Sequence, residues 1–278
     1  MRNALTVDVE DYFQVQAFAD TIAADEWDTR ERRVEANTNR VLDLFSDCDV
    51  KATFFTLGWV AERWPELIRR IVNEGHELAS HGFEHHRVFE QTPDQFREDV
   101  RRTKVLLEDL GGQPVAGYRA ASFSIDGRTP WAHDILAAEG HLYSSSVYPV
   151  KHDIYGMPEA DPVPHSAADG LIEIPISTVD VLGRRLPCGG GGYFRLLPYF
   201  WSRWAWQRVN GDAGRPFIFY FHPWEIDPGQ PRVEGAPLKS RFRHYTNLHK
   251  MEAKIRRALK DFSWGRMDDV YLNGGASS

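Results

Sequence analysis

Short apolar runs alternate with longer amphipathic segments along most of the chain. LTVDV at 5–9 and KATFFTLG at 51–58 are rich in β-branched and aromatic residues, which is typical of strands. Similar runs predict strands at 76–81, 116–122, 142–149, 171–178 and 217–225. Elsewhere apolar positions recur at helical spacing, which predicts helices at 34–47, 59–74, 93–110, 129–139 and 247–262.

This alternation is typical of βαβ units and a parallel sheet. The chain has about seven such units and no G-x-G-x-x-G after the first strand, which favours an α/β barrel over a dinucleotide-binding sheet. The glycine run at 189–192 lacks the Lys-Ser/Thr of a phosphate loop, so it is a cleft wall or a plain connector. We expect one domain over 1–278, with a core at about 4–227 and a C-terminal extension with a terminal helix at about 228–265.

Composition narrows the range of partners and compartments. A formal net charge of -7 argues against nucleic acid as a partner. The two cysteines, Cys48 and Cys188, lie far apart in sequence, which excludes a disulfide scaffold and disfavours a thiolate metal site. With no signal-like or membrane-spanning apolar run, we expect a cytoplasmic protein. Basic residues on the tail helix leave contact with the inner face of the membrane open. The sequence does not indicate an oligomeric state.

Polar residues gather where the predicted strands end. In a barrel the carboxyl ends of the strands meet at one mouth, where catalytic groups lie. The residues that end the predicted strands or follow them closely are Asp8, Glu10, Asp11, His81, His85, Arg119 and His222. Their convergence on one mouth indicates a site more strongly than any one of them alone.

The segment SHGFEHH, at 80–86, suggests a metal site. Two imidazoles four residues apart on a helical turn would share a face and could bind one divalent cation, although such a pair also occurs on wet surfaces. A catalytic metal also needs a third protein ligand and an open position. Asp8 and Glu10 lie on one face of the first strand and Asp11 lies past its end, so one carboxylate can bind the metal while another acts as a base.

Several segments together resemble polysaccharide deacetylases with a NodB homology domain, the carbohydrate esterase family 4 group, over nearly the whole chain. Within this group the chain is most similar to the subfamily found beside exopolysaccharide and exosortase (PEP-CTERM) loci. The family fold is a distorted (β/α) barrel, which agrees with the alternation above. The segments that carry the resemblance are TVDVEDYFQV, KATFFTLGWVAERWPELIRRI, GHELASHGFEHHRV, GYRAASFSI, SSSVYPVKHDIYGMP, GGGGYFRLLPY, FYFHPWEIDPGQPR and TNLHKMEAKIRRALKDF.

The resemblance implies a role for each matching position. Asp8 matches the catalytic base, Arg119 the arginine that orients it, and His222 the general acid. His81 and His85 match the metal-binding histidines, with Glu10 preferred as third ligand and Asp11 as the alternative. Relatives often carry an aspartate after the tyrosine that corresponds to Tyr143, where it tunes the acid histidine. Ser144 stands there in this chain, which puts the pH optimum in doubt.

The implied activity is metal-dependent removal of N-acetyl groups from an N-acetylated oligo- or polysaccharide or its lipid-linked precursor, in exopolysaccharide biosynthesis. Zn²⁺ is the default metal, and Ni²⁺, Co²⁺ and Fe²⁺ remain open. Trp224 and Tyr193 lie near predicted loops and are candidate substrate-binding residues, because flat apolar faces suit sugar rings. Two alternatives stay open: an amidase acting on a small cyclic amide, and a non-catalytic carbohydrate-binding protein.

Overall fold

A computed structural model describes residues 1–152 and 156–272, so three positions of SSSVYPVKHDIYGMP lie outside the described residues. Its main sheet has the strand order β10-β1-β2-β3-β4-β5-β7-β6, with β11 paired to β1. All neighbours in this order are parallel except β6, which runs antiparallel to β7. The strands are Arg2–Val9 (β1), Thr53–Thr56 (β2), Glu77–Ser80 (β3), Gly117–Tyr118 (β4), Tyr143–Ser144 (β5), His165–Ala168 (β6), Leu171–Glu173 (β7), Ile218–Phe221 (β10) and Ser263–Gly265 (β11).

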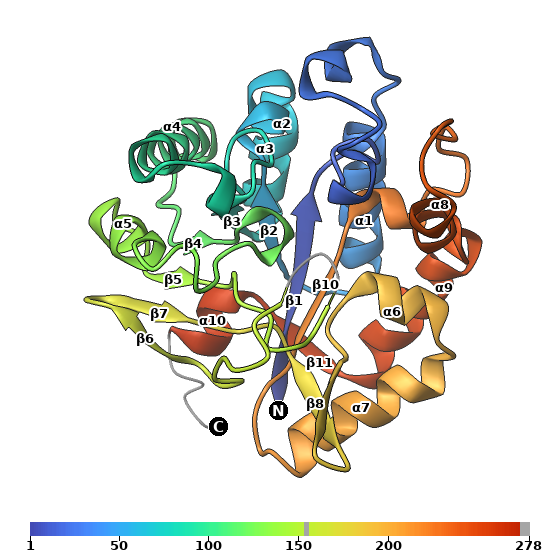
Figure 1. Cartoon of the computed structure of the whole chain (residues 1–278). Helices are drawn as coiled ribbons and strands as arrows, with labels where there is room; N and C mark the ends of the chain where they lie inside the picture. Colours follow the sequence, from blue (N-terminus) through green and yellow to red (C-terminus); the bar gives the residue numbers. More distant parts are fainter. Residues whose placement is uncertain (153–155, 273–278) are drawn as a thin grey trace.

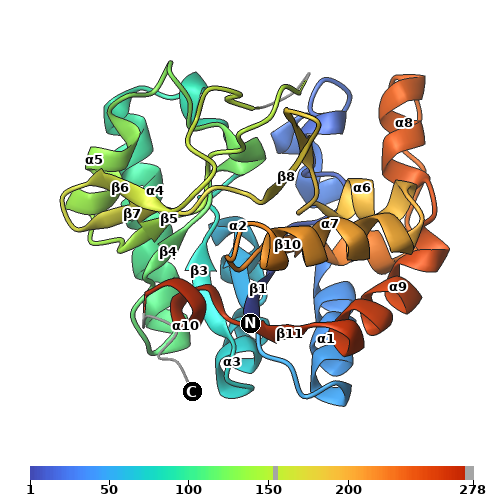
Figure 2. The same ribbon diagram turned by 90° about the horizontal axis from the view of Figure 1, so that it is seen from below.

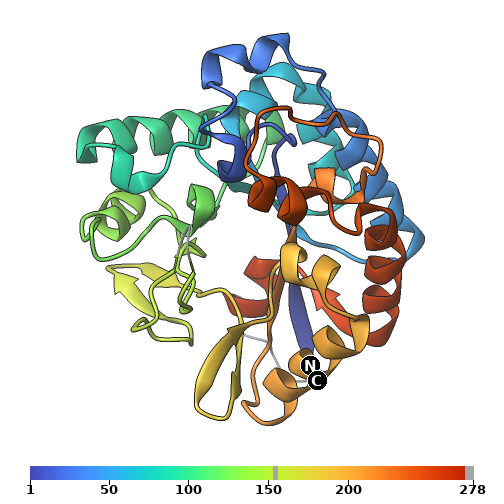
Figure 3. The same ribbon diagram turned by 45° about the vertical axis from the view of Figure 1, so that its right-hand side comes forward.

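The sheet curls into a half-barrel with helices around it (Figures 1 and 3). The predicted α/β architecture of the distorted (β/α) barrel type is therefore confirmed. A separate hairpin joins β8, Thr178–Val181, to β9, Arg184–Pro187. The helices are Val34–Asp47 (α1), Gly58–Arg63 (α2), Pro65–Asn73 (α3), Pro93–Gly111 (α4), Ala132–Ala138 (α5), Gly191–Leu196 (α6), Tyr199–Gly211 (α7), Leu238–Tyr245 (α8), Leu248–Asp261 (α9) and Met267–Tyr271 (α10). Short 3₁₀ turns are η1, Gln16–Phe18; η2, Ala24–Thr29; η3, Val88–Glu90; η4, Ala121–Phe123; and η5, Pro223–Ile226.

The central strands are buried on both faces, which explains their continuous apolar runs. Every residue of β2 and β10 is buried, as expected for a parallel sheet covered on both sides. Strand β1 runs through the middle of the sheet and pairs with β2 and β10 (Figure 1). Its carboxyl end therefore lies beside the ends of both neighbours, and this placement brings the site residues together.

The helix predicted at 59–74 is wrong as a single element. The chain forms α2 and α3 instead, with a break at Trp64, whose φ of -130° and ψ of 66° are not helical. Pro65 at the first position of α3 explains the break, because proline disfavours helical geometry in the residue before it. The strand predicted at 171–178 is also wrong as one element, since β7 belongs to the main sheet and β8 to the hairpin.

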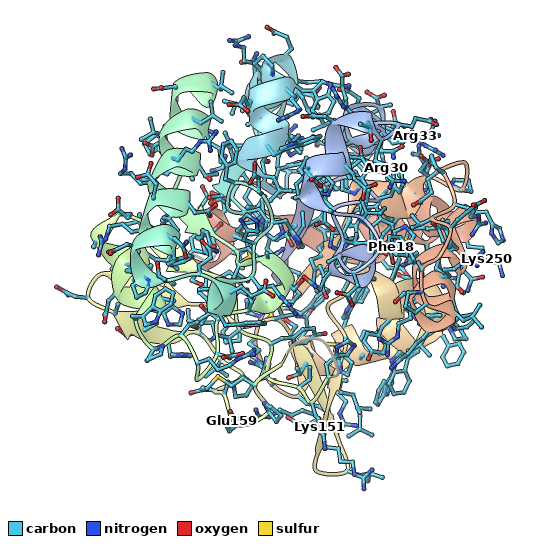
Figure 4. All side chains as sticks on the ribbon, turned by 45° about the horizontal axis from the view of Figure 1, so that its top comes forward. Phe18, Arg30, Arg33, Lys151, Glu159 and Lys250 are labelled. Carbon is cyan, nitrogen blue, oxygen red and sulfur yellow. The ribbon has the colours of Figure 1, made fainter. Side chains whose placement is uncertain are left out.

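The C-terminal part of the chain packs against the sheet. Helix α9 buries Met251 and Ile255 in the core, whereas Lys250 projects outward (Figure 4). Strand β11 and α10 then cross the lower end of the sheet near the N-terminus (Figure 2). None of the helices in 1–152 and 156–272 is long and apolar enough to cross a membrane.

Candidate active site

Asp8 lies at the end of β1 and forms a buried ion pair with Arg119. Its Oδ1 accepts a hydrogen bond of 2.5 Å from Arg119 Nη1. Neither side chain is more than 3% exposed, so the pair is shielded from water. Bonds between charged partners in such surroundings are short and strong, so the arginine fixes the direction of the carboxylate.

Arg119 is itself held from several sides. It follows β4, and its backbone N–H donates to the carbonyl of Ser80 at the end of β3. Its guanidinium donates to the Thr6 hydroxyl at 2.9 Å and to the Ser145 carbonyl at 3.3 Å. The ring of Phe55 lies 4.0 Å from its Cζ, which adds a cation–π contact. An arginine anchored to four strand ends can hold Asp8 with little freedom to move.

Glu10, His81 and His85 form a compact group of potential metal ligands. One donor atom from each lies within 4.8 Å of the others. Glu10 Oε2 is 3.0 Å from His85 Nε2, yet this buried oxygen has no hydrogen-bond partner among the described residues. Two ligands of one zinc ion lie roughly 3.3 Å apart, given metal–ligand distances near 2 Å and tetrahedral angles. The spacing and the orphaned oxygen therefore fit a shared cation.

The charge states of this group also suit metal binding. His81 Nδ1 donates to the carbonyl of Arg119 at 2.8 Å, which leaves Nε2 as the free donor atom. Burial lowers the pKa of His81 to about 4 despite the nearby Asp8, so its ring is neutral at pH 7. Burial would raise the pKa of Glu10, but His85 and His222 outweigh it and lower the pKa to about 2. The neutral imidazole of His81 and the ionised carboxylate of Glu10 are the forms that bind metals.

His81 and His85 lie on a loop after β3 and not on a helical turn. The loop reverses at Gly82, with a φ of +76°, and at His85, with a φ of +57°. It is docked on α2, where the backbone N–H of Gly58 donates to the Gly82 carbonyl. The ring of Phe83 covers Gly58 so closely that a Cβ there would lie 2.3 Å from it. The spacing of four residues thus brings the histidines together through a tight loop.

Asp11, the alternative third ligand, lies outside this group and points toward α1. Its carboxylate accepts backbone N–H bonds from Tyr12 at 2.8 Å, Arg33 at 2.7 Å and Val34 at 2.9 Å. Burial raises the pKa of Asp11 to about 6 in spite of these bonds. With its oxygens used at the start of α1, Asp11 has a structural role.

His222 follows β10 and faces both carboxylates of β1. Its Nε2 lies 3.4 Å from Glu10 Oε1 and 3.9 Å from Asp8 Oδ2. Burial alone would lower its pKa, but Glu10, Glu225 and Asp8 together raise it to about 9. Its Nε2 is the ring nitrogen that faces the two carboxylates, and the residue lines the cavity.

Sequence reasoning did not identify Glu225 and Arg195. Glu225 Oε1 lies 2.9 Å from His222 Nδ1, and Arg195 Nε donates to Glu225 Oε2 at 2.5 Å. The spacing of His222 and Glu225 in HPWE was a usable signal, because a 3₁₀ turn brings residues three apart onto one side. Arg195 had no such signal, since its partner is distant in sequence.

The two candidate sugar-binding residues differ in what they can offer a ligand. Trp224 is 6% exposed and is stacked between His222, at a ring distance of 5.2 Å, and His244, at 4.0 Å. It also lines the cavity, so a sugar contact at Trp224 stays a prediction. Tyr193 is half-buried and lines the cavity, so it remains available.

These groups line one cavity of about 330 Å³. Asp8, Glu10, His81, His85 and His222 all contribute to its wall. Its size is at the lower end of ordinary ligand sites. The Asp8 carboxylate, a potential metal site and the His222 imidazole thus face a common space.

Comparison with known proteins agrees with this arrangement. Residues 145–272 match a domain of unknown function, DUF3473, and residues 23–137 match the family described as polysaccharide deacetylase. A peptidoglycan-N-acetylglucosamine deacetylase of Bacillus cereus is 37% identical over 75 residues, which is 27% of this chain and 27% of that protein. The chain thus matches little more than a quarter of that relative's length.

Two solved structures show the same fold over nearly the whole chain. A putative polysaccharide deacetylase from Mycobacterium smegmatis superposes with a TM-score of 0.61 at 23% identity, covering 98% of this chain and 89% of the other. The Puue allantoinase superposes with a TM-score of 0.59 at 17% identity, covering 99% and 90%. At these identities the likeness concerns the fold. The sequence match to polysaccharide deacetylases is confined to residues 23–137, whereas the fold is shared over nearly the whole chain.

Proposed function

We propose that this protein is a metal-dependent hydrolase that removes N-acetyl groups from an N-acetylated sugar polymer or its lipid-linked precursor. The supporting observation is the convergence of the Asp8–Arg119 pair, the Glu10–His81–His85 group and His222 on one cavity. The name of the Bacillus cereus relative points to N-acetylglucosamine units as the class of substrate. The resemblance to the exopolysaccharide subfamily suggests exopolysaccharide biosynthesis as the setting.

Glu10, His81 and His85 would hold the metal, and Zn²⁺ suits this set of one carboxylate and two imidazoles. A bound divalent ion supplies Lewis acidity at the acyl oxygen and lowers the pKa of a bound water. His81 contributes Nε2, because its Nδ1 donates to the Arg119 carbonyl. This bond fixes both the tautomer and the direction of the ring.

Asp8 acts as the general base. The ion pair with Arg119 occupies Oδ1, which leaves Oδ2 facing His222 across the cavity at 3.9 Å. A water molecule beside Oδ2 gives its proton to Asp8 while its oxygen attacks the acetyl carbon. The negative charge that develops on the acyl oxygen then needs an electrophile or an N–H donor nearby.

His222 acts as the general acid. As the C–N bond breaks, the electron pair goes to nitrogen, and His222 Nε2–H protonates it. The products are acetate and the free sugar amine. An amine leaves poorly without a proton, and His222 Nε2, 3.9 Å from Asp8 Oδ2, lies where it can supply one.

The proposal is tested with metal content and acetate release measured on the same samples. Wild type, His81→Ala and His85→Ala are compared with His86→Ala, the adjacent exposed histidine of the same segment. We expect about one ion per chain in wild type and His86→Ala, lost in the other two together with acetate release from an N-acetylglucosamine oligomer. A small cyclic amide is assayed in parallel.

Three outcomes would contradict the proposal. Metal with hydrolysis of the cyclic amide alone would favour an amidase. Metal with neither activity would indicate another amide or ester as substrate. No metal in wild type after incubation with Zn²⁺ would remove the catalytic proposal and favour a carbohydrate-binding protein.

A further inference from the structure

The half of the chain that matches a domain of unknown function contains a buried ion pair, Arg195–Glu225, behind His222. We propose that Glu225, held by Arg195, is a positioning residue that fixes the His222 ring with Nε2 toward the cavity. The inference rests on the proposed function, because it concerns the acid of that reaction. It assigns a role to residues of the second half of the chain, which the match to the deacetylase family does not cover.

The contact between Glu225 and His222 is specific in direction. Glu225 Oε1 accepts from His222 Nδ1 at 2.9 Å and from the His222 backbone N–H at 3.0 Å. An ionised carboxylate only accepts, so Nδ1 carries a hydrogen in this contact. Arg195 and His222 lower the pKa of Glu225 to about 2 against the opposing effect of burial, which keeps it ionised. The other ring nitrogen is thereby directed at the carboxylates of β1.

Arg195 holds Glu225 and ties it to the C-terminal segment. Its side chain is 2% exposed and donates to the carbonyls of Arg243, His244 and Thr246 as well as to Glu225. Five donors in a rigid fork can satisfy one carboxylate oxygen and several carbonyls at once. Glu225 is consequently fixed by a group that is itself anchored between α8 and α9.

A second support keeps the ring of His222 in plane. Trp224 stacks on it with an interplanar angle of 16°, and His244 stacks on Trp224 at 11°. His244 Nε2 is in turn bonded to Gln230 Oε1 at 2.6 Å. The His222 ring is therefore restrained at its Nδ1 edge by Glu225 and on its face by Trp224. Rotation of the ring would break the first contact or clash with the second residue.

Packing against Glu225 explains one glycine of the run at 189–192. A Cβ on Gly191 would lie 2.2 Å from Glu225 Oε1, a distance that forces the carboxylate to move. The next residue, Gly192, has no heavy atom within 4 Å of a Cβ built on it. Gly191 thus allows close approach of the backbone to Glu225, whereas Gly192 does not serve that purpose.

Glu225 also supplies a carboxylate beside His222 although Ser144 stands where relatives often carry an aspartate. The Ser144 hydroxyl donates to Ser146 at 2.8 Å, so β5 brings no acid to His222. In this chain the carboxylate comes from the turn that follows His222 instead. The same histidine edge is thereby supported from a different element of the fold.

The test compares two substrates that differ in their need for an acid. Hydrolysis of an N-acetylglucosamine oligomer requires protonation of the leaving amine, whereas 4-nitrophenyl acetate releases a stable anion without it. For Glu225→Gln we expect kcat on the amide to fall by about 10²-fold or more, with KM, metal content and ester hydrolysis unchanged. Gly191→Ala, which removes no functional group, should shift the amide-to-ester ratio in the same direction, and Gly192→Ala should keep it.

If Glu225→Gln and Gly191→Ala lose amide and ester hydrolysis in parallel, the Arg195–Glu225 pair merely supports the fold. If neither activity changes, Glu225 does not position His222. Both outcomes would overturn the proposal. ¹⁵N NMR of imidazole nitrogens in wild type, with His222 assigned by comparison with His222→Asn, does not depend on turnover. We expect a protonated Nδ1 whose signal shifts in Glu225→Gln. An unprotonated Nδ1 overturns the positioning role even in an active enzyme. A protonated Nδ1 in a protein that hydrolyses neither substrate would instead contradict the proposed function alone.

Discussion

Replacing Asp11 with alanine tests whether Asp11 and Glu10, both near the end of β1, have different roles. The structure assigns Asp11 to the start of α1, where it accepts backbone N–H bonds from Tyr12, Arg33 and Val34. Glu10 instead faces His81 and His85. We therefore expect Asp11→Ala to lower the free energy of unfolding while metal binding is kept. Glu10→Gln should instead lose metal binding and keep the free energy of unfolding of the metal-free protein.

The size of the loss follows from the bonds and from the burial of the charge. Hydrogen bonds to a charged acceptor are each worth about 1.5–3 kcal/mol, and the variant leaves three buried or half-buried donors without a partner. The wild-type carboxylate also has a cost, because burial raises the pKa of Asp11 from 3.8 to about 6. Keeping such a group ionised at pH 7 therefore costs about 3 kcal/mol. The net loss of unfolding free energy should be about 1.5–6 kcal/mol, or roughly 3–10 °C in Tm for a chain of this length.

Thermal unfolding followed by circular dichroism measures this loss, in a chelator so that bound metal does not contribute. Thr92→Ala is the matched control, because it removes one cap bond, from Gln95 N–H at 3.3 Å, at the start of α4. It should cost about 1 kcal/mol and leave metal content unchanged. If Asp11→Ala keeps its Tm but loses its metal, as Glu10→Gln is expected to, Asp11 is a ligand and the reasoning fails.

Three further variants test other parts of the site and the core. Arg119→Met leaves the charge of Asp8 buried and unpaired, so unfolding in urea should show a loss of about 3–5 kcal/mol, much of it recovered when Asp8→Asn is added; additive losses would refute the pairing. Gly58→Ala places a methyl 2.3 Å from a ring of the histidine loop and should weaken metal binding by about 10- to 100-fold by calorimetric titration, whereas Gly127→Ala, in open space, should not. Burial lowers the pKa of His141 to about 3, so unfolding takes up a proton between about pH 3 and 6.5, and stability falls as pH falls through that window. In His141→Phe the slope should be shallower by up to about 1.4 kcal/mol per pH unit, and an equal slope would contradict the assignment.

The elements predicted best are those whose local signals agree with their packing. Helix α1 matches its predicted range of 34–47, because its apolar spacing and its buried face are the same residues. Helix α4 begins at Pro93 behind Thr92, whose side chain and Gln95 form a capping box. The apolar runs of β2 and β10 were identifiable because burial on both faces of a parallel sheet permits few polar residues.

The failures arise where the deciding partner is distant in sequence. The run at 171–178 alternates apolar residues with Glu173, Pro175 and Ser177, and the pairing of β7 with β5 and of β8 with β9 decides that it divides between two sheets. The histidine spacing could not distinguish a helical turn from a loop, because the loop depends on contacts with α2. The stacking of His244 on Trp224 likewise has no sequence signal.

The site also explains why two differently described segments occur in one chain. Asp8 and Glu10 precede both matched segments, His81, His85 and Arg119 lie in the deacetylase match, and His222, Glu225 and Arg195 lie in the domain of unknown function. β10 delivers His222 by pairing with β1 in register at Val7–Phe221, directly beside Asp8. The residues of the deacetylase match thus have no proposed acid of their own, and under the mechanism proposed here they cannot protonate an amine leaving group.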